Sequence, residues 1–191
     1  MSIIEIEVTL EFVEPPVTRT LQVPHTIRLD RLHLTLQAAM GWTNSHLYIF
    51  EAAGVTWGVP DPELGGADLP ASKTSLAQVI EDTDVHTVRY VYDLGDGWEH
   101  RLQIGKITPL VPGELYPRLT EVSGQCPPED VGGPPGYEEF CAAMKDPNHP
   151  EHVHLKDWHG TGFDAGTPPA DELRLEVLKL AKRWKPKQKE G

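Results

Sequence analysis

Two carboxylates and an imidazole are closely spaced in the segment 92–100, which reads YDLGDGWEH. Asp93, Asp96 and His100 flank a Gly-Asp-Gly sequence that favours a tight hairpin turn between two β-strands. Such a turn brings the three side chains to one end of a sheet, where they can coordinate a metal ion or act as general acid and base. The structural alternative is that the aspartates accept hydrogen bonds from turn amides while the glycines supply positive φ angles.

A second acidic group lies in the segment 126–137, which reads CPPEDVGGPPGY. The prolines and glycines predict a stiff loop that holds Glu129, Asp130 and the Cys126 thiol in a defined geometry. The loop leads into a helix, and a helix N-terminus attracts anions. The loop serves equally well as a structural cover over a small core, and the sequence leaves both interpretations open.

We predict that the two segments converge on one pocket. Trp98 and Tyr137 are expected to hold the loop against the sheet, because a proline-rich loop has few backbone hydrogen bonds and relies on aromatic contacts. A divalent metal is the candidate cofactor, although the spacing does not demand one. The candidate metal ligands are Asp96, His100, Glu129 and Asp130, and the full candidate pocket comprises Asp93, Asp96, Trp98, His100, Cys126, Glu129, Asp130, Gly132, Gly133 and Tyr137.

A third group of candidate metal ligands is the run of histidines His149, His152, His154 and His159. His149 and His152 are three positions apart and would share one face of a helix. A third ligand at a suitable spacing is not evident, so adventitious nickel or zinc binding is expected rather than a native zinc site.

The two cysteines, Cys126 and Cys141, form neither a CxxC nor a Cys₂His₂ pattern, so no structural zinc is indicated. A Cys126 nucleophile would need His46 or His100 as its base, and a lone cysteine beside two prolines is more typical of packing. A disulfide scaffold is not expected from two cysteines, and a reducing cytoplasm is the predicted location.

The elements that must position these groups begin with strands. Residues 4–12 alternate between apolar and polar, which predicts a half-buried strand, and residues 18–23 alternate again after Pro15-Pro16, which predicts a hairpin. Further strands are expected at 46–51, 55–59, 86–94 and 98–107. The apolar face of the first strand that must be covered comprises Ile4, Ile6, Val8, Leu10 and Phe12.

Helices are predicted from apolar residues that recur at helical spacing. Residues 29–40 form the first, with Gly41 as its C-terminal cap, and Ser75 with Gln78 matches a capping box that opens a second, short helix. Residues 137–144 and 169–184 predict two more. The fold class is therefore α+β, an antiparallel sheet with a packed helix, followed by a proline- and glycine-rich loop and C-terminal helices.

We predict a single domain over residues 1–191. It comprises a sheet-plus-helix core at 3–107, an ordered Pro/Gly-rich loop at 108–136, a helical part at 137–184 and a basic tail at 185–191.

The composition excludes several classes of protein. The chain has 191 residues with 17 Lys and Arg against 29 Asp and Glu, a net charge of −12. A surface this acidic repels phosphate backbones, so general nucleic-acid binding is disfavoured. There is no apolar run long enough to span a membrane, and the acidic, alternating N-terminus is unlike a signal peptide.

The motifs YDLGDGWEH at 92–100, CPPEDVGGPPG at 126–136 and the following GYEEF resemble the plasmid pRiA4b ORF-3-like family. AAMGW at 38–42, SHLYIF at 45–50 and DPNHPEH at 146–152 also fit, and the resemblance covers roughly residues 3–180. It implies an α+β fold of the MM3350-like type, an association with plasmids and mobile elements, and no established activity.

Three functional classes follow. The first is a non-catalytic binding module with an acidic pocket for a small ligand or a protein partner. The second is a metal-dependent hydrolase that uses the Asp, His and Glu cluster, and the third is a nucleic-acid accessory protein that acts through the basic tail. The acidic body disfavours the third class, and the absence of a complete nucleophile–base or metal-ligand signature favours the first over the second.

Overall fold

The computed structural model describes residues 2–60 and 67–185 of the chain. Its centre is an eight-stranded sheet in the order β5-β4-β3-β6-β7-β1-β2-β8, antiparallel throughout except for the pairing of β4 with β5. The α+β prediction is thus confirmed. The strands are β1 (Ser2–Leu10), β2 (Val17–Pro24), β3 (Tyr48–Ala52), β4 (Val55–Gly58), β5 (Leu69–Pro70), β6 (Thr87–Tyr92), β7 (Trp98–Pro109) and β8 (Arg118–Ser123).

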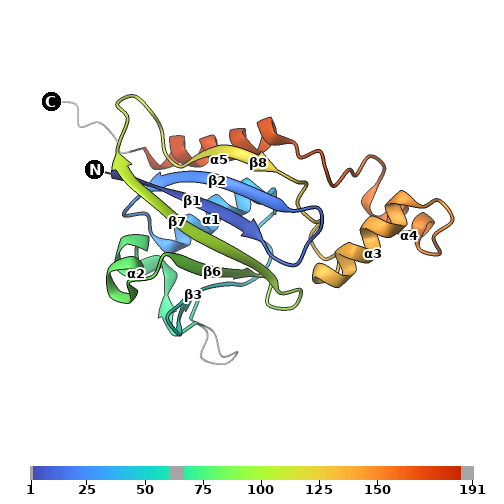
Figure 1. Ribbon diagram of the computed structural model, residues 1–191, viewed down its shortest axis with the longest axis horizontal. Helices are drawn as coiled ribbons and strands as arrows, with labels where there is room; N and C mark the ends of the chain where they lie inside the picture. The colour runs from blue at the N-terminus through green and yellow to red at the C-terminus, as the bar shows by residue number, and fades with distance from the viewer. Residues whose placement is uncertain (1, 61–66, 186–191) are drawn as a thin grey trace.

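Helices pack on the sheet and extend beyond one end of it. α5 packs against α1 and β8, whereas α3 and α4 project from the end of the molecule opposite the chain termini (Figure 1). The turn between β6 and β7 points toward this same end, near α3 (Figure 1). The helices are α1 (Leu29–Met40), α2 (Leu76–Thr83), α3 (Gly133–Lys145), α4 (His152–His159) and α5 (Ala170–Trp184), with a 3₁₀ turn, η1 (Ala71–Lys73), before α2.

The core forms where the alternating strands meet the helices. Ile4, Ile6, Val8 and Leu10 of β1 are all buried, as expected for a strand with one face turned inward. Phe12 is an exception to the predicted apolar face. The strand ends at Leu10, and Phe12 adopts a φ of 65° in the turn to β2, which leaves its side chain 73% exposed.

The predicted caps are present. Gly41 ends α1 with a φ of 87°, a left-handed conformation that suits glycine. At α2 the Ser75 hydroxyl accepts a hydrogen bond from the Gln78 amide, and the Gln78 side chain accepts one from the Ser75 amide, which is a complete capping box. These local patterns therefore identify the C-terminal end of α1 and the N-terminal end of α2 correctly.

The segment 108–136 is more regular than the sequence suggests. Residues 118–123 form β8, which pairs with the edge of β2, and α3 starts at Gly133 rather than at Tyr137. The sequence does not predict β8, because only Leu119 of it is buried and its partner β2 lies far away in the sequence. The early start of α3 is explained by Pro134 and Pro135, which a helix accepts in its first turn.

Arg19 of β2 ties β8 and the loop to the core. Its side chain is only 1% exposed and donates to the backbone carbonyls of Ala39, Ser123 and Gly124. A buried guanidinium is costly unless its N–H groups find acceptors, so these contacts link α1, β2 and the chain leading to Cys126. The basic tail predicted at 185–191 lies, apart from Lys185, outside the described residues.

No helix among the described residues is both long and apolar enough to cross a membrane.

Candidate functional site

Three segments meet at the end of the sheet where β6 turns into β7. They are the turn itself (93–97), the loop 126–132 and the link 41–47 between α1 and β3. Hydrogen bonds join the loop to each of the other two segments, through Thr43 and Glu129 and through Asp96 and Gly132.

Asp93 organises the turn. Its backbone has a φ of 56°, and its Oδ1 accepts hydrogen bonds from the amides of Gly95 (3.0 Å) and Asp96 (3.3 Å). This is the structural role that an Asx turn assigns to an aspartate. Its second carboxylate oxygen, Oδ2, is directed instead toward His46 at 3.6 Å.

Asp96 docks the loop onto the turn. Its Oδ2 accepts a hydrogen bond from the amide of Gly132 at 3.1 Å. At Gly133, which has a φ of 69°, a Cβ atom would lie 2.4 Å from the Asp96 carbonyl oxygen. Only glycine permits so close an approach of two backbones, so the second glycine of VGG is needed for docking.

Glu129 clamps the loop onto the link. One carboxylate oxygen accepts from the Thr43 amide (3.0 Å) and the Thr43 hydroxyl, and the other accepts from the Tyr92 hydroxyl at 2.6 Å. Trp42 adds a hydrogen bond from its indole N–H to the Pro127 carbonyl at 2.9 Å. The Glu129 carboxylate is thus occupied by internal hydrogen bonds.

His46, Asp93 and Asp130 form a compact polar group, here called the His46 cluster. His46 Nε2 lies 3.0 Å from Asp130 Oδ1 and 3.6 Å from Asp93 Oδ2, and one ligand atom from each of the three residues lies within 4.8 Å of the others. It is the one group of three or more potential metal ligands in the described part of the chain.

Four candidate pocket residues are buried beneath this surface. Trp98, Cys126 and Tyr137 are at most 4% exposed, and His100 is completely buried. Burial lowers the pKa of His100 to about 4 and raises the pKa of the Cys126 thiol to about 12. A neutral imidazole and a protonated thiol that solvent does not reach are poor catalytic groups, which argues against a Cys126 nucleophile.

The sequence predicts only part of the aromatic support of the loop 126–132. Trp98 packs near Trp42, with ring centroids 5.9 Å apart, and the Tyr137 hydroxyl donates to the Gln125 carbonyl at 3.4 Å. Two other aromatic residues, Trp42 and Tyr92, donate hydrogen bonds directly to the loop, and the sequence did not single out either of them.

The four predicted metal ligands therefore do not share one site. Asp130 belongs to the His46 cluster, whereas Asp96 and Glu129 accept structural hydrogen bonds and His100 lies in the core. His46 was considered in the sequence only as a partner for Cys126. The signal that could have identified it is its position just before β3, because β3 pairs with β6 and thereby places His46 beside the residues that follow Tyr92.

Part of the loop also lines a cavity of about 390 Å³ between the end of α1 and α5. Its walls include three glutamates, Glu129, Glu172 and Glu176, together with His159 and the Trp42 side chain. The described lining contains no Lys or Arg, so the cavity is acidic, and its volume lies in the range of small-molecule sites. Glu176 also pairs with Lys179 on the exposed side of α5.

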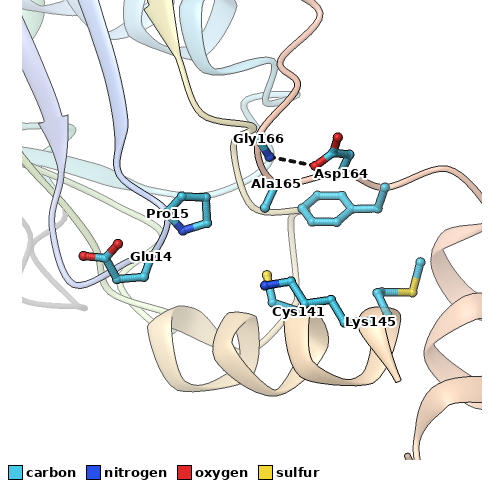
Figure 2. A pocket seen from close by; sticks show the side chains of 9 residues that line it. Glu14, Pro15, Cys141, Lys145, Asp164, Ala165 and Gly166 are labelled. Atoms are coloured by element: carbon cyan, nitrogen blue, oxygen red, sulfur yellow. Dashed lines mark hydrogen bonds between the residues drawn. The ribbon is translucent and has the colours of Figure 1, made fainter. Parts of the chain in front are cut away.

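A larger cavity of about 460 Å³ has none of the predicted site residues in its lining (Figure 2). Cys141 and Lys145 of α3 line one side, and Glu14 with Pro15 and the 163–166 segment line the others. The Asp164 carboxylate is already hydrogen-bonded to the Gly166 amide, and burial raises the pKa of Cys141. The groups in this cavity thus provide no complete catalytic arrangement.

The C-terminal histidines do not converge in the structure. His149 Nε2 lies 3.4 Å from Glu139, and His152 Nδ1 donates to the Ala143 carbonyl of α3 at 2.7 Å. These contacts attach the segment 149–152, at which α4 begins, to α3, and within residues 2–60 and 67–185 the histidines share no three-ligand group.

The fold of the chain matches that of a solved structure. The crystal structure of MM3350, a protein of unknown function from Methanosarcina mazei Go1, matches with a TM-score of 0.80 and 28% identity, over 90% of this chain and 97% of that one. The protein is therefore an MM3350-like α+β protein, as the motifs suggested.

The chain belongs to the plasmid pRiA4b ORF-3-like family, whose model matches residues 2–171. The uncharacterized protein y4hQ from Sinorhizobium fredii (strain NBRC 101917 / NGR234) is 47% identical over 184 residues, 96% of this chain and 94% of that protein. These relatives confirm the predicted family, and none of their names indicates a catalytic activity.

Proposed function

We propose that the protein is a non-catalytic binding module that recognises a positively charged group, either on a small ligand or on a partner protein. The observation that carries this proposal is the acidic cavity of about 390 Å³ bounded by the docked loop, with Glu129, Glu172 and Glu176 in its walls. Carboxylates in a partly enclosed site attract a guanidinium or ammonium group more strongly than they would in open water.

The cavity is preformed, which favours binding. Glu129 and Trp42 hold the loop in place through hydrogen bonds to Thr43, Tyr92 and Pro127, so little conformational entropy is lost when a ligand enters. The proposal includes a cytoplasmic location and an association with plasmids, supported by the two free cysteines and by the family's name.

The second candidate function is a metal-dependent hydrolase. The His46 cluster favours it, since a divalent ion held by His46, Asp93 and Asp130 at an exposed rim would supply a Lewis acid. The binding module is preferred because the buried Cys126 and His100 provide neither a nucleophile nor a base, and Glu129 is engaged in internal hydrogen bonds.

The test is calorimetric titration of tag-free protein in EDTA with agmatine and, separately, with a short arginine-containing peptide. The two probes distinguish a free ligand from a partner side chain. Saturable binding that is weakened by the double variant Glu172→Gln, Glu176→Gln is expected. The matched control is Glu81→Gln, Asp82→Asn on α2, which removes the same charge from an exposed surface.

Equal binding by both double variants, or no binding by the wild type, would show that the cavity is not the site. Phosphatase, esterase and nuclease screens with added Mg²⁺, Mn²⁺ and Zn²⁺ complete the experiment. Turnover that is lost in Asp130→Asn would replace the binding module with the hydrolase.

A further inference from the structure

We propose that His46, Asp93 and Asp130 bind one divalent transition-metal cation of the Zn²⁺ or Mn²⁺ type. This site is separate from the acidic cavity, and the inference goes beyond the binding function proposed above because either can hold without the other. Four features of the His46 cluster support the site: its distances, the unpaired imidazole nitrogen, its charge balance and the support of each ligand.

The distances suit a shared ion. With metal–ligand bonds of about 2.0–2.1 Å, two ligand atoms are separated by about 2.9 Å at an octahedral angle and by about 3.4 Å at a tetrahedral angle. His46 Nε2 lies 3.0 Å from Asp130 Oδ1 and 3.6 Å from Asp93 Oδ2. The Asp93 and Asp130 ligand atoms lie within 4.8 Å of each other, so side-chain adjustments within the cluster would place all three atoms around one cation.

The imidazole nitrogen lacks a hydrogen bond. His46 Nε2 is shielded from solvent, yet it forms no hydrogen bond of acceptable geometry, although two carboxylate oxygens are close to it. A buried polar atom without a partner costs free energy, so the arrangement is explained better by a cation accepting the nitrogen lone pair than by an N–H group pointing past its acceptors.

The charge balance also favours a cation. Among the residues that the structure describes, no Lys or Arg comes within 4.0 Å of the Asp93 or Asp130 carboxylate. Two carboxylates this close to each other repel unless a positive charge lies between them. A divalent ion neutralises both while leaving His46 neutral, which is the form in which imidazole coordinates metals.

Each ligand is supported by the surrounding fold. Asp93 is oriented by the amides of Gly95 and Asp96, which bind Oδ1 and leave Oδ2 free for the site. The backbone amide of His46 donates to the Tyr92 hydroxyl, and Asp130 follows directly after the clamped Glu129. Such outer contacts fix ligand orientation in metal sites.

The ligand types select the ion. One imidazole nitrogen with two carboxylate oxygens suits borderline cations such as Zn²⁺, Mn²⁺ or Fe²⁺, whereas Mg²⁺ prefers oxygen ligands alone. The Asp130 side chain is 70% exposed, so the ion would have an entry path and coordination positions open to water or to a further ligand.

The experiment titrates Zn²⁺, Mn²⁺ and Mg²⁺ into metal-free, tag-free protein by calorimetry and records the visible absorption of a Co²⁺ complex. The test variant is Asp93→Asn, Asp130→Asn, because asparagine tolerates the positive φ at both positions and preserves the turn. The matched control is Asp82→Asn, Asp84→Asn at the end of α2, which removes the same charge from exposed positions, and Asp84 likewise has a positive φ. Thermal unfolding verifies that every variant is folded.

One equivalent of Zn²⁺ or Mn²⁺ should bind to the wild type and to Asp82→Asn, Asp84→Asn, with Mg²⁺ weaker. The double variant should bind at least about tenfold more weakly, since loss of even an outer-shell contact costs that much. His46→Gln should abolish the Co²⁺ signal of a nitrogen ligand.

Two results would overturn the inference. One is the absence of stoichiometric binding by the wild type, which would leave the His46 cluster as an internal ion pair. The other is binding that survives in the double variant but is lost in His149→Gln, His154→Gln, which would assign the ion to the surface histidines alone. Neither result bears on the binding of agmatine in EDTA, so the two proposals fail independently.

Discussion

Two buried histidines should make the protein lose stability in weakly acidic solution. His33 and His100 are 3% and 0% exposed, and burial lowers the pKa of each to about 4. The hydrogen bonds of His33 fit a neutral imidazole, because Nδ1 can accept from the Tyr90 hydroxyl while Nε2 donates to Asn44 Oδ1. His100 keeps one proton on Nδ1, which faces the carbonyls of Tyr90 and Trp98.

The sign follows from proton linkage. An unfolded histidine has a pKa of about 6.5, so below that pH the unfolded chain binds protons that the folded protein excludes. The stabilisation is therefore fully present above about pH 6.5 and is lost as the pH falls toward about 4. With these two pKa values, each histidine costs about 2 kcal/mol between about pH 7.5 and pH 5, or about 4 kcal/mol together.

Thermal unfolding followed by circular dichroism measures this loss. For a chain of this size, about 4 kcal/mol corresponds to a fall in Tm of about 8–16 °C over the same pH interval. Most carboxylates titrate below this interval, which makes it selective for histidine. His100→Gln and His33→Gln should each remove about half of the slope, whatever they do to the absolute Tm.

The control is His154→Gln, which removes an exposed imidazole and should leave the slope unchanged. A Tm that is flat between about pH 7.5 and pH 5 would refute the reasoning, since the burial penalty on the charged form would then be absent. Equal slopes in the wild type and in both buried-site variants would refute it as well.

Four further substitutions should alter the free energy of unfolding. Trp42→Phe leaves the Pro127 carbonyl without its donor and should cost about 1–3 kcal/mol in urea unfolding. Gly133→Ala should cost about 2–4 kcal/mol by the same assay, because its Cβ meets a backbone oxygen at 2.4 Å. Gly113→Ala, with a similar φ of 88° and open space, should cost only about 1–2 kcal/mol, and equal losses would contradict the docking argument. Ser75→Ala removes the α2 cap and should lower stability by about 1 kcal/mol, measured as a fall in Tm of about 2–4 °C.

Several features of the protein could be predicted from the sequence because they depend on neighbours a few positions away. The alternation in residues 4–10 reports which face of β1 is buried, and the Gly41 cap and the Ser75 capping box mark helix ends through contacts within one turn. The family motifs identified the fold, since they span nearly the whole chain.

Other features depended on tertiary contacts. Phe12 has the right period for the core, yet the chain turns before reaching it, and β8 exists because it can pair with β2 across a large sequence separation. The local sequence predicts neither the turn before Phe12 nor the pairing of β8 with β2, because pairing partners and strand lengths are set by packing of the whole sheet.

The candidate site shows most clearly which features the sequence predicts and which depend on tertiary contacts. The sequence placed Asp93, Asp96, Glu129 and Asp130 in two segments that would meet, but it could not distinguish which carboxylates would be consumed by internal hydrogen bonds. The tertiary structure decided that Asp96 and Glu129 dock the loop and that His46 joins Asp93 and Asp130. The physical reason is that an acidic side chain has the same chemistry in the sequence whether it meets an amide or an imidazole, and only the packing of β3 beside β6 and the loop determines which one it meets.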